Sequence, residues 1–130
     1  MGNQKFSKYE KLKSRKKIKQ LFDGGNQVNH FPFLINWKFE NEYNDDFPAQ
    51  VAISVSKRKI KKAVQRNRIK RKIREVYRKN KFLIYNLLND IKQSICFMVI
   101  YNSTDELNYS EMEKELLKGL KKMIEAIKTK

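Results

Sequence analysis

Alternation of hydrophobic and polar residues predicts the strands of this sequence. In residues 33–39, FLINWKF, bulky apolar side chains occupy every second position, which is the period of a strand with one buried face. Residues 51–56, VAISVS, alternate in the same way, and we expect the two segments to pair as antiparallel neighbours. Residues 95–101, ICFMVIY, are apolar throughout, which is typical of a central strand covered on both faces. Residues 28–31 could add a further strand.

Apolar residues at intervals of three and four predict helices near both ends of the chain. Residues 15–22, RKKIKQLF, place three apolar side chains on one helical face, and Ser14 before them is a suitable N-cap. A pair of glycines then ends this helix. Residues 111–128 predict an amphipathic helix with one buried stripe, and Ser110 with Glu113 predicts a capping box at its start.

The order of these elements predicts a single α+β domain over residues 1–130. A long basic helix, projected over residues 60–79, precedes residues 82–92, FLIYNLLNDIK, which we also interpret as helical. The predicted order is helix, strand, strand, basic helix, strand, helix, with the additional strand near 28–31. Residues 1–13 are polar and basic, and we expect them to form a loosely ordered tail.

The basic helix is expected to have two opposed faces. At about 100° per residue, Ile69, Ile73, Val76 and Tyr77 share one arc, which is suited to the core. Four pairs of like charges at i and i+4 lie on the cationic side and together cost about 1–2 kcal/mol in the isolated protein, partly relieved by an attraction between Arg71 and Glu75. This repulsion indicates an anionic partner. The cationic arc holds Asn67, Lys70, Arg71, Arg74 and Arg78.

The net charge of +16 narrows the classes of partner. Residues 1–89 contain 23 Lys and Arg against 7 acids, whereas residues 90–130 contain 7 of each, so the whole excess lies in the first part of the chain. Such a field attracts nucleic acid or an anionic membrane. A helix bound at a membrane surface needs a free apolar face, and the sheet requires the apolar face of this one. Nucleic acid is therefore favoured, with DNA and RNA both open.

Other chemistry finds little support in the sequence. Cys96 lies inside an apolar run and is expected to be a small buried hydrophobe, and Trp37 is expected in the core. His30 has no His or Cys partner at ligand spacing, so no zinc site is expected. The acids are scattered, which argues against a stand-alone nuclease. No signal peptide and no run of roughly 20 apolar residues is found, so we expect a cytoplasmic protein with no membrane partner.

The segment SVSKRKIKKAVQRNRIKRKIRE, residues 54–75, resembles the signature of the bacterial ribonuclease P protein component. That signature is a Ser-Val-Ser-Lys strand end followed by Arg-Asn-Arg-x-Lys-Arg-x-x-Arg on a helix. The segments KLKSRKKIKQLFDGG, residues 11–25, and LNYSEMEKELLKGLKK, residues 107–122, resemble the first and last helices of the family. The resemblance implies a mixed sheet with a left-handed crossover around the basic helix.

The resemblance also implies a function in tRNA maturation. A ribonuclease P protein subunit binds the catalytic RNA and the 5′ leader of precursor tRNA, and assists the Mg²⁺-dependent endonucleolytic removal of that leader. It implies that the RNA carries the chemistry and holds most of the Mg²⁺, so the protein alone should be inactive. We expect no catalytic residue, no metal held by the protein and no stable protein partner. The alternative is a ribosomal or other structural nucleic-acid-binding protein without a role in cleavage.

The resemblance assigns two groups of site residues. Asn67 is the most specific of them, because an uncharged amide among cations suits a defined hydrogen bond or a metal-bound water. Phe22 suits a core position and a stacking platform equally, and this chain has Ile18 and Asn36 where the family commonly places aromatic residues. The contacts with the catalytic RNA are assigned to Lys57, Arg58, Arg66, Asn67, Arg68, Lys70, Arg71 and Arg74. The leader-binding cleft, between the first helix and the sheet, is assigned to Ile18, Phe22, Leu34 and Asn36, with Lys13 and Arg15.

Overall fold

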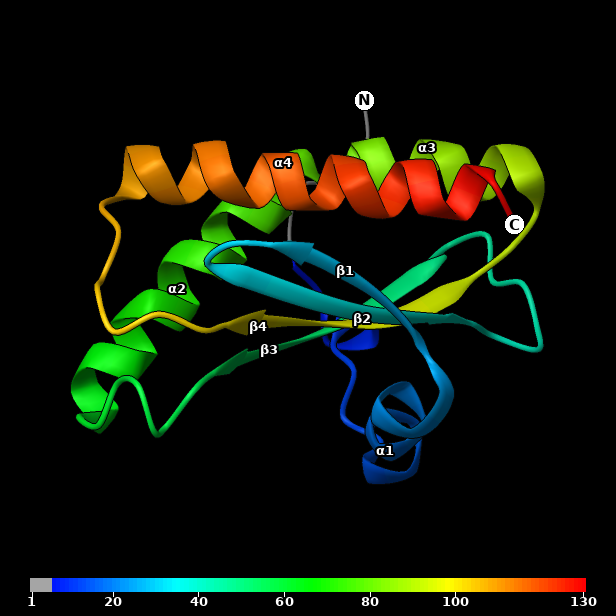
Figure 1. Ribbon diagram of the computed structural model, residues 1–130. Helices are drawn as coiled ribbons and strands as arrows, with labels where there is room; N and C mark the ends of the chain where they lie inside the picture. Colours follow the sequence, from blue (N-terminus) through cyan, green and yellow to red (C-terminus); the bar gives the residue numbers. More distant parts are fainter. Residues whose placement is uncertain (1–5) are drawn as a thin grey trace.

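Four strands form one mixed sheet with helices on both of its faces (Figure 1). The computed structural model describes residues 6–130. The strands are β1 (Asn26–His30), β2 (Phe33–Phe39), β3 (Ala49–Val55) and β4 (Ile95–Tyr101), in the spatial order β1-β2-β4-β3. The helices are α1 (Arg15–Gly24), α2 (Ala63–Asn80), α3 (Phe82–Ile91) and α4 (Tyr109–Lys128), preceded by a short 3-10 helix, η1 (Lys8–Glu10). The α+β class is therefore confirmed.

Strand β4 lies at the centre of the sheet, antiparallel to β2 and parallel to β3. The expected direct pairing of β2 with β3 is wrong. A strand that is apolar at every position exposes the least apolar surface to water when a strand lies on each side of it and both of its faces are covered. Strand β4 therefore lies between β2 and β3. Helices α2 and α3 form the crossover that joins β3 to β4 on one face. The additional strand expected near 28–31 is β1, which pairs antiparallel with β2.

The main core lies between the sheet and helices α2 and α4, above the sheet in Figure 1. Helix α2 buries its four apolar residues, Ile69, Ile73, Val76 and Tyr77, as its helical period predicts. Trp37 of β2 is fully buried in the same core, as expected. Burial of a large apolar side chain is worth about 1.5–3 kcal/mol, so these contacts fix the rotation of α2 about its own axis.

Helix α1 covers the opposite face of the sheet and forms a smaller cluster (Figure 1). Leu21 of α1 packs with Cys96 and Met98 of β4, and Ile18 is half-buried beside them. Burial raises the pKa of the Cys96 thiol to about 11, which agrees with its expected role as a small hydrophobe. Because α1 has only 10 residues, it covers part of this face and leaves Leu34 half-buried.

The helix ends follow the polar residues that satisfy their first backbone N–H groups. Ser14 Oγ accepts a hydrogen bond from the Lys17 N–H at 3.2 Å and caps α1 as expected. The capping box expected at Ser110 and Glu113 is wrong, because α4 begins two residues earlier. Asn108 Oδ1 accepts from the Glu111 N–H at 2.8 Å, and the Glu111 carboxylate accepts from the Asn108 N–H. Asn caps as well as Ser, so the earlier pair starts the helix.

The segment before α1 packs on the domain, which differs from the loosely ordered tail expected for residues 1–13. The Glu10 carboxylate, 2% exposed, accepts hydrogen bonds from Lys81 Nζ at 2.6 Å and from the Tyr85 hydroxyl. The buried Leu12 donates its N–H to the Val51 carbonyl at 2.9 Å, at the outer edge of β3. Residues 1–5 of the expected tail lie outside the described residues.

Replacement of Glu10 by Ala tests this anchor. The change removes the buried carboxylate that accepts hydrogen bonds from Lys81 and Tyr85, so we expect the free energy of unfolding to fall by about 3–5 kcal/mol. Urea denaturation measures it. The matched control is Glu42→Ala, which removes an exposed carboxylate and should change stability by less than about 0.5 kcal/mol. Equal effects of the two substitutions would contradict the anchoring role.

Candidate nucleic-acid interface

The side of α2 that faces away from the sheet carries a row of cations. The burial of Ile69 and Ile73 directs this side to solvent, so the two opposed faces expected from the sequence are confirmed. Of the polar residues on this side, Lys70 is half-buried, whereas Asn67, Arg68, Arg71 and Arg74 are exposed. We call this surface the cationic face of α2. Its members are Asn67, Arg68, Lys70, Arg71 and Arg74. Arg78, which the predicted arc also contained, is half-buried and pairs with Glu75.

Arg66 supports the turn that leads into α2. Its Nη1 donates to the carbonyl oxygens of Ile60 and Lys61, both at 2.8 Å. Lys57 and Arg58 lie exposed in this turn, at the end of β3. Part of the Arg66 guanidinium is therefore hydrogen-bonded to the backbone. Arg66 positions the neighbouring cations and also adds its own positive charge.

Glu106, in the loop between β4 and α4, neutralises part of the cationic face. The Nε and Nη2 atoms of Arg68 donate to its two carboxylate oxygens at 2.8 and 2.7 Å, and Lys72 Nζ donates at 2.8 Å. These contacts, the hydrogen bond from Arg68 foremost, lower the pKa of Glu106 to about 2. Glu106 is 38 residues from Arg68 in the sequence, so no local pattern could have predicted the pair.

The outer part of the cationic face keeps its charge. Among residues 6–130, no side chain forms a hydrogen bond or ion pair with Arg71, Arg74 or Asn67. The expected attraction between Arg71 and Glu75 is wrong, because Glu75 instead accepts from Arg78 at 2.6 Å. The like-charge repulsion predicted at i and i+4 therefore persists between Lys70 and Arg74.

The residues assigned to the leader-binding cleft divide into exposed and buried positions. Phe22, at the end of α1, is 58% exposed, so it is not a core residue, and its role as a stacking platform stays a prediction. Asn36 is 3% exposed, and its Oδ1 accepts a hydrogen bond from Gln27 Nε2 at 3.2 Å. Ile18 and Leu34 are half-buried on the α1 side of the sheet. Lys13 and Arg15, just before and at the start of α1, are exposed.

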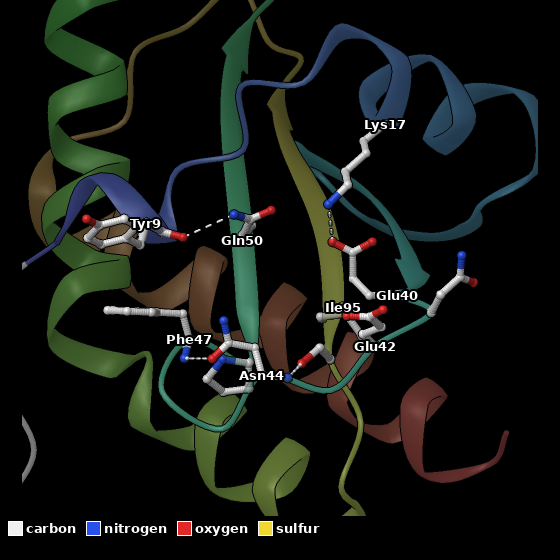
Figure 2. Close-up of a pocket in the computed structure, with 11 residues that line it drawn as sticks. Tyr9, Lys17, Glu40, Glu42, Asn44, Phe47, Gln50 and Ile95 are labelled. Carbon is white, nitrogen blue, oxygen red and sulfur yellow. Dashed lines mark hydrogen bonds and ion pairs between the residues drawn. The ribbon is translucent and has the colours of Figure 1, made fainter.

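A cavity of about 410 Å³ lies at the other end of the α1 side, near the starts of β3 and β4 (Figure 2). Lys17 points into it and pairs with Glu40 at 2.8 Å, and Glu42 also lines it. Because two carboxylates line this cavity and its single cation is already paired, binding of a phosphate there is disfavoured. No pattern in the sequence predicted this cavity, and its two carboxylates distinguish it from the cationic face.

Three further observations concern metal binding, His30 and membrane spans within residues 6–130. No three or more of their His, Cys, Asp and Glu side chains group closely enough to hold a metal ion. His30 Nε2 lies 2.8 Å from the Glu115 carboxylate and is held on α4. None of the helices within this part of the chain has both the length and the apolar character of a membrane span.

An α+β domain in which Arg71 and Arg74 face solvent without a carboxylate partner, on a helix fixed to the core, has a surface of the kind typical of nucleic-acid-binding proteins. The sequence profile of the family described as Ribonuclease P matches residues 6–124. The chain therefore belongs to the ribonuclease P protein family, and its role is that of the protein subunit of this enzyme.

Similar proteins agree with this assignment. The ribonuclease P protein component of Porphyromonas gingivalis is 33% identical over 117 residues, covering 88% of this chain and 82% of the relative. That of Streptococcus pneumoniae is 35% identical over 112 residues, covering 85% and 81%. The fold matches an RNase P protein mutant of Staphylococcus aureus with defective mRNA degradation activity (TM-score 0.68, 23% identity, 88% and 87% covered). It also matches the RNase P protein of Thermotoga maritima (TM-score 0.64, 20% identity, 84% and 93% covered).

The Glu106 cluster predicts a specific acid response. Because the folded-state pKa of Glu106 is lowered from 4.5 to about 2, its stabilising effect is full above pH 4.5 and is lost as the pH falls towards 2. We therefore expect wild type to be more stable than Glu106→Gln at pH 6, with the difference shrinking between pH 4.5 and 2. Thermal unfolding of both proteins at several pH values measures this. A difference that does not depend on pH would contradict the assignment.

Proposed function

We propose that this subunit binds the catalytic RNA of ribonuclease P through the cationic face of α2. One observation carries the proposal: Arg71 and Arg74 project from a helix that is fixed by its buried side and face solvent without a carboxylate partner. Arg binds phosphate through a planar fork, and an ordered row of such groups suits a folded RNA backbone. Asn67 lies among them and can donate and accept a specific hydrogen bond.

The 5′ leader of precursor tRNA is the second ligand in this proposal. Phe22 presents an exposed ring at the edge of the α1 side of the sheet, and single-stranded bases stack on such rings at about 1–3 kcal/mol per base. Leu34, half-buried on the same side of the sheet, offers a further apolar surface. Asn36 is already hydrogen-bonded inside the sheet, so it would act as a support for the cleft and leave stacking to Phe22.

The catalytic chemistry is proposed to reside in the RNA, with Mg²⁺ held mainly there. The carboxylates of Glu10, Glu40 and Glu106 each pair with a cation of the protein. None of these three carboxylates is thus available to hold a hydrated metal ion or to activate water. The proposed contribution of the protein is to neutralise phosphates, so that catalytic RNA and substrate come together at a lower Mg²⁺ concentration.

Reconstitution tests the proposed function. Purified protein should leave precursor tRNA intact, and it should accelerate cleavage when added to its cognate catalytic RNA at low Mg²⁺, because it replaces part of the cation requirement. Gel analysis of the cleaved leader measures both. Cleavage of precursor tRNA or of an mRNA by protein free of RNA would place chemistry in the protein. Absence of any acceleration would favour the structural nucleic-acid-binding alternative.

Salt titration tests the cationic face residue by residue. Arg71→Ala should weaken binding to the catalytic RNA and reduce the slope of log K against log salt by about one unit. Arg68→Ala should have a smaller effect, because Glu106 already neutralises much of that charge. Lys121→Ala, an exposed position on α4, is the control and should change neither quantity. Equal slopes for Arg71→Ala and the control would remove Arg71 from the interface.

Substitution of Phe22 tests the leader cleft. Phe22→Ala should weaken binding of precursor tRNA to the holoenzyme by about 1–3 kcal/mol and leave binding of mature tRNA unchanged, because mature tRNA has no leader. Phe82→Ala is the matched control, since Phe82 is 52% exposed and lies on α3. If Phe22→Ala affects precursor and mature tRNA alike, Phe22 does not contact the leader.

A further inference from the structure

A cavity of about 240 Å³ lies at the outer edge of β3, between the N-terminal segment and α2. It joins two regions that the resemblance treated as separate sites. Arg74 belongs to the cationic face of α2, whereas Lys13 was assigned to the leader-binding cleft. The residues that decide its chemistry are Phe6, Lys11, Lys13, Val51, Ile53 and Arg74.

The charge of this cavity is uniformly positive. Three cations line it, and its lining contains no carboxylate. The cavity in Figure 2 is the internal comparison, because Glu40 and Glu42 line that one and its Lys17 is already paired. A phosphate would therefore be attracted to the edge of β3 and repelled from the cavity near Glu40 and Glu42.

The walls of the cavity are apolar and held in place. The Phe6 ring contacts Tyr77 edge-on, with ring centroids 5.7 Å apart, and Lys11 Nζ lies 5.8 Å from the centroid of Phe6. Val51 and Ile53 of β3 complete the wall. The aromatic ring and aliphatic side chains suit the ribose and base of a nucleotide, and the cations beside them suit its phosphate.

The outer edge of β3 also offers backbone groups. Within residues 6–130, the only bridge on this edge joins Lys11 and Val51, where the Leu12 N–H donates to the Val51 carbonyl. Groups two residues apart on a strand face the same edge, so the N–H and C=O of Ile53 point outward as well. These groups can hydrogen-bond to a ligand that occupies the cavity.

We propose that this cavity is a subsite for one unpaired RNA nucleotide. Lys11, Lys13 and Arg74 hold the phosphate, and the ribose or base lies against Phe6 and the edge of β3. An unpaired nucleotide fits because a duplex keeps its bases stacked inside and cannot place one against the Phe6 wall. The proposal rests on the proposed function, and the nucleotide comes from either the 5′ leader or a single-stranded part of the catalytic RNA.

The test compares two double variants of equal charge. Lys11→Gln with Lys13→Gln removes the two exposed lysines of the subsite, and Lys16→Gln with Lys19→Gln removes two exposed lysines of α1. Each protein is titrated against catalytic RNA alone, and each holoenzyme against precursor tRNA with leaders of increasing length. We expect the subsite variant to weaken one of these interactions at least about tenfold and the α1 variant to weaken it by less than about threefold.

The arms of the titration identify the source of the nucleotide. A loss that appears only above a certain leader length assigns the subsite to the leader, and a loss against catalytic RNA alone assigns it to that RNA. Equal losses in the two double variants would overturn the subsite while leaving the proposed function intact. Failure of the wild-type protein to bind the catalytic RNA would instead overturn the proposed function.

A third variant addresses the wall of the subsite. Phe6→Leu keeps an apolar side chain against Tyr77 and removes the ring, so circular dichroism should show an unchanged fold. In the arm where the double variant loses affinity, Phe6→Leu should lose it as well, with an unchanged salt slope because no charge is removed. Wild-type affinity for a folded Phe6→Leu protein would overturn the contact with the ribose or base.

Discussion

The burial of one side of α2 is the constraint on which the rest of this structure depends. Ile69, Ile73, Val76 and Tyr77 can leave water only by packing against the sheet, and this contact fixes the helix in a single rotation. The cations on the other side of the helix are therefore directed towards solvent. Packing of the core outweighs the repulsion that remains, about 0.2–0.5 kcal/mol for each like-charge pair without a carboxylate, so the domain can keep like charges close together without RNA.

Local periodicity predicted the elements well because each period reports a burial pattern. The strand at 33–39, the apolar central strand and the two faces of α2 all follow from which positions are apolar, and the structure confirms them. Periodicity does not report which strand lies beside which. The pairing of β2 with β4 depends on the path of the chain through α2 and α3, and this path decides it over a distance of roughly 60 residues.

Long-range ion pairs account for most of what the sequence could not show at the site. Arg68 and Glu106 are 38 residues apart, and Glu10 and Lys81 are 71 apart. Neither pair leaves a trace in local spacing, yet the first reduces the charge of the interface and the second orders the segment that lines the cavity at β3. The resemblance assigned Lys13 to the same cleft as Phe22. In the structure Lys13 also lines the cavity that Arg74 lines, because the segment before α1 runs along the edge of β3.

The carboxylates that line the larger cavity give the molecule an electrical polarity. Glu40 and Glu42 lie in the connection that enters β3, together with Asp45 and Asp46, whereas Lys57 and Arg58 follow its last residue. The two ends of one strand therefore carry opposite charge. In the field of a long polyanion, such a dipole favours the orientation in which α2 faces the polyanion and the acidic loop faces away from it. A larger fraction of the encounters with such a polyanion would then begin at α2.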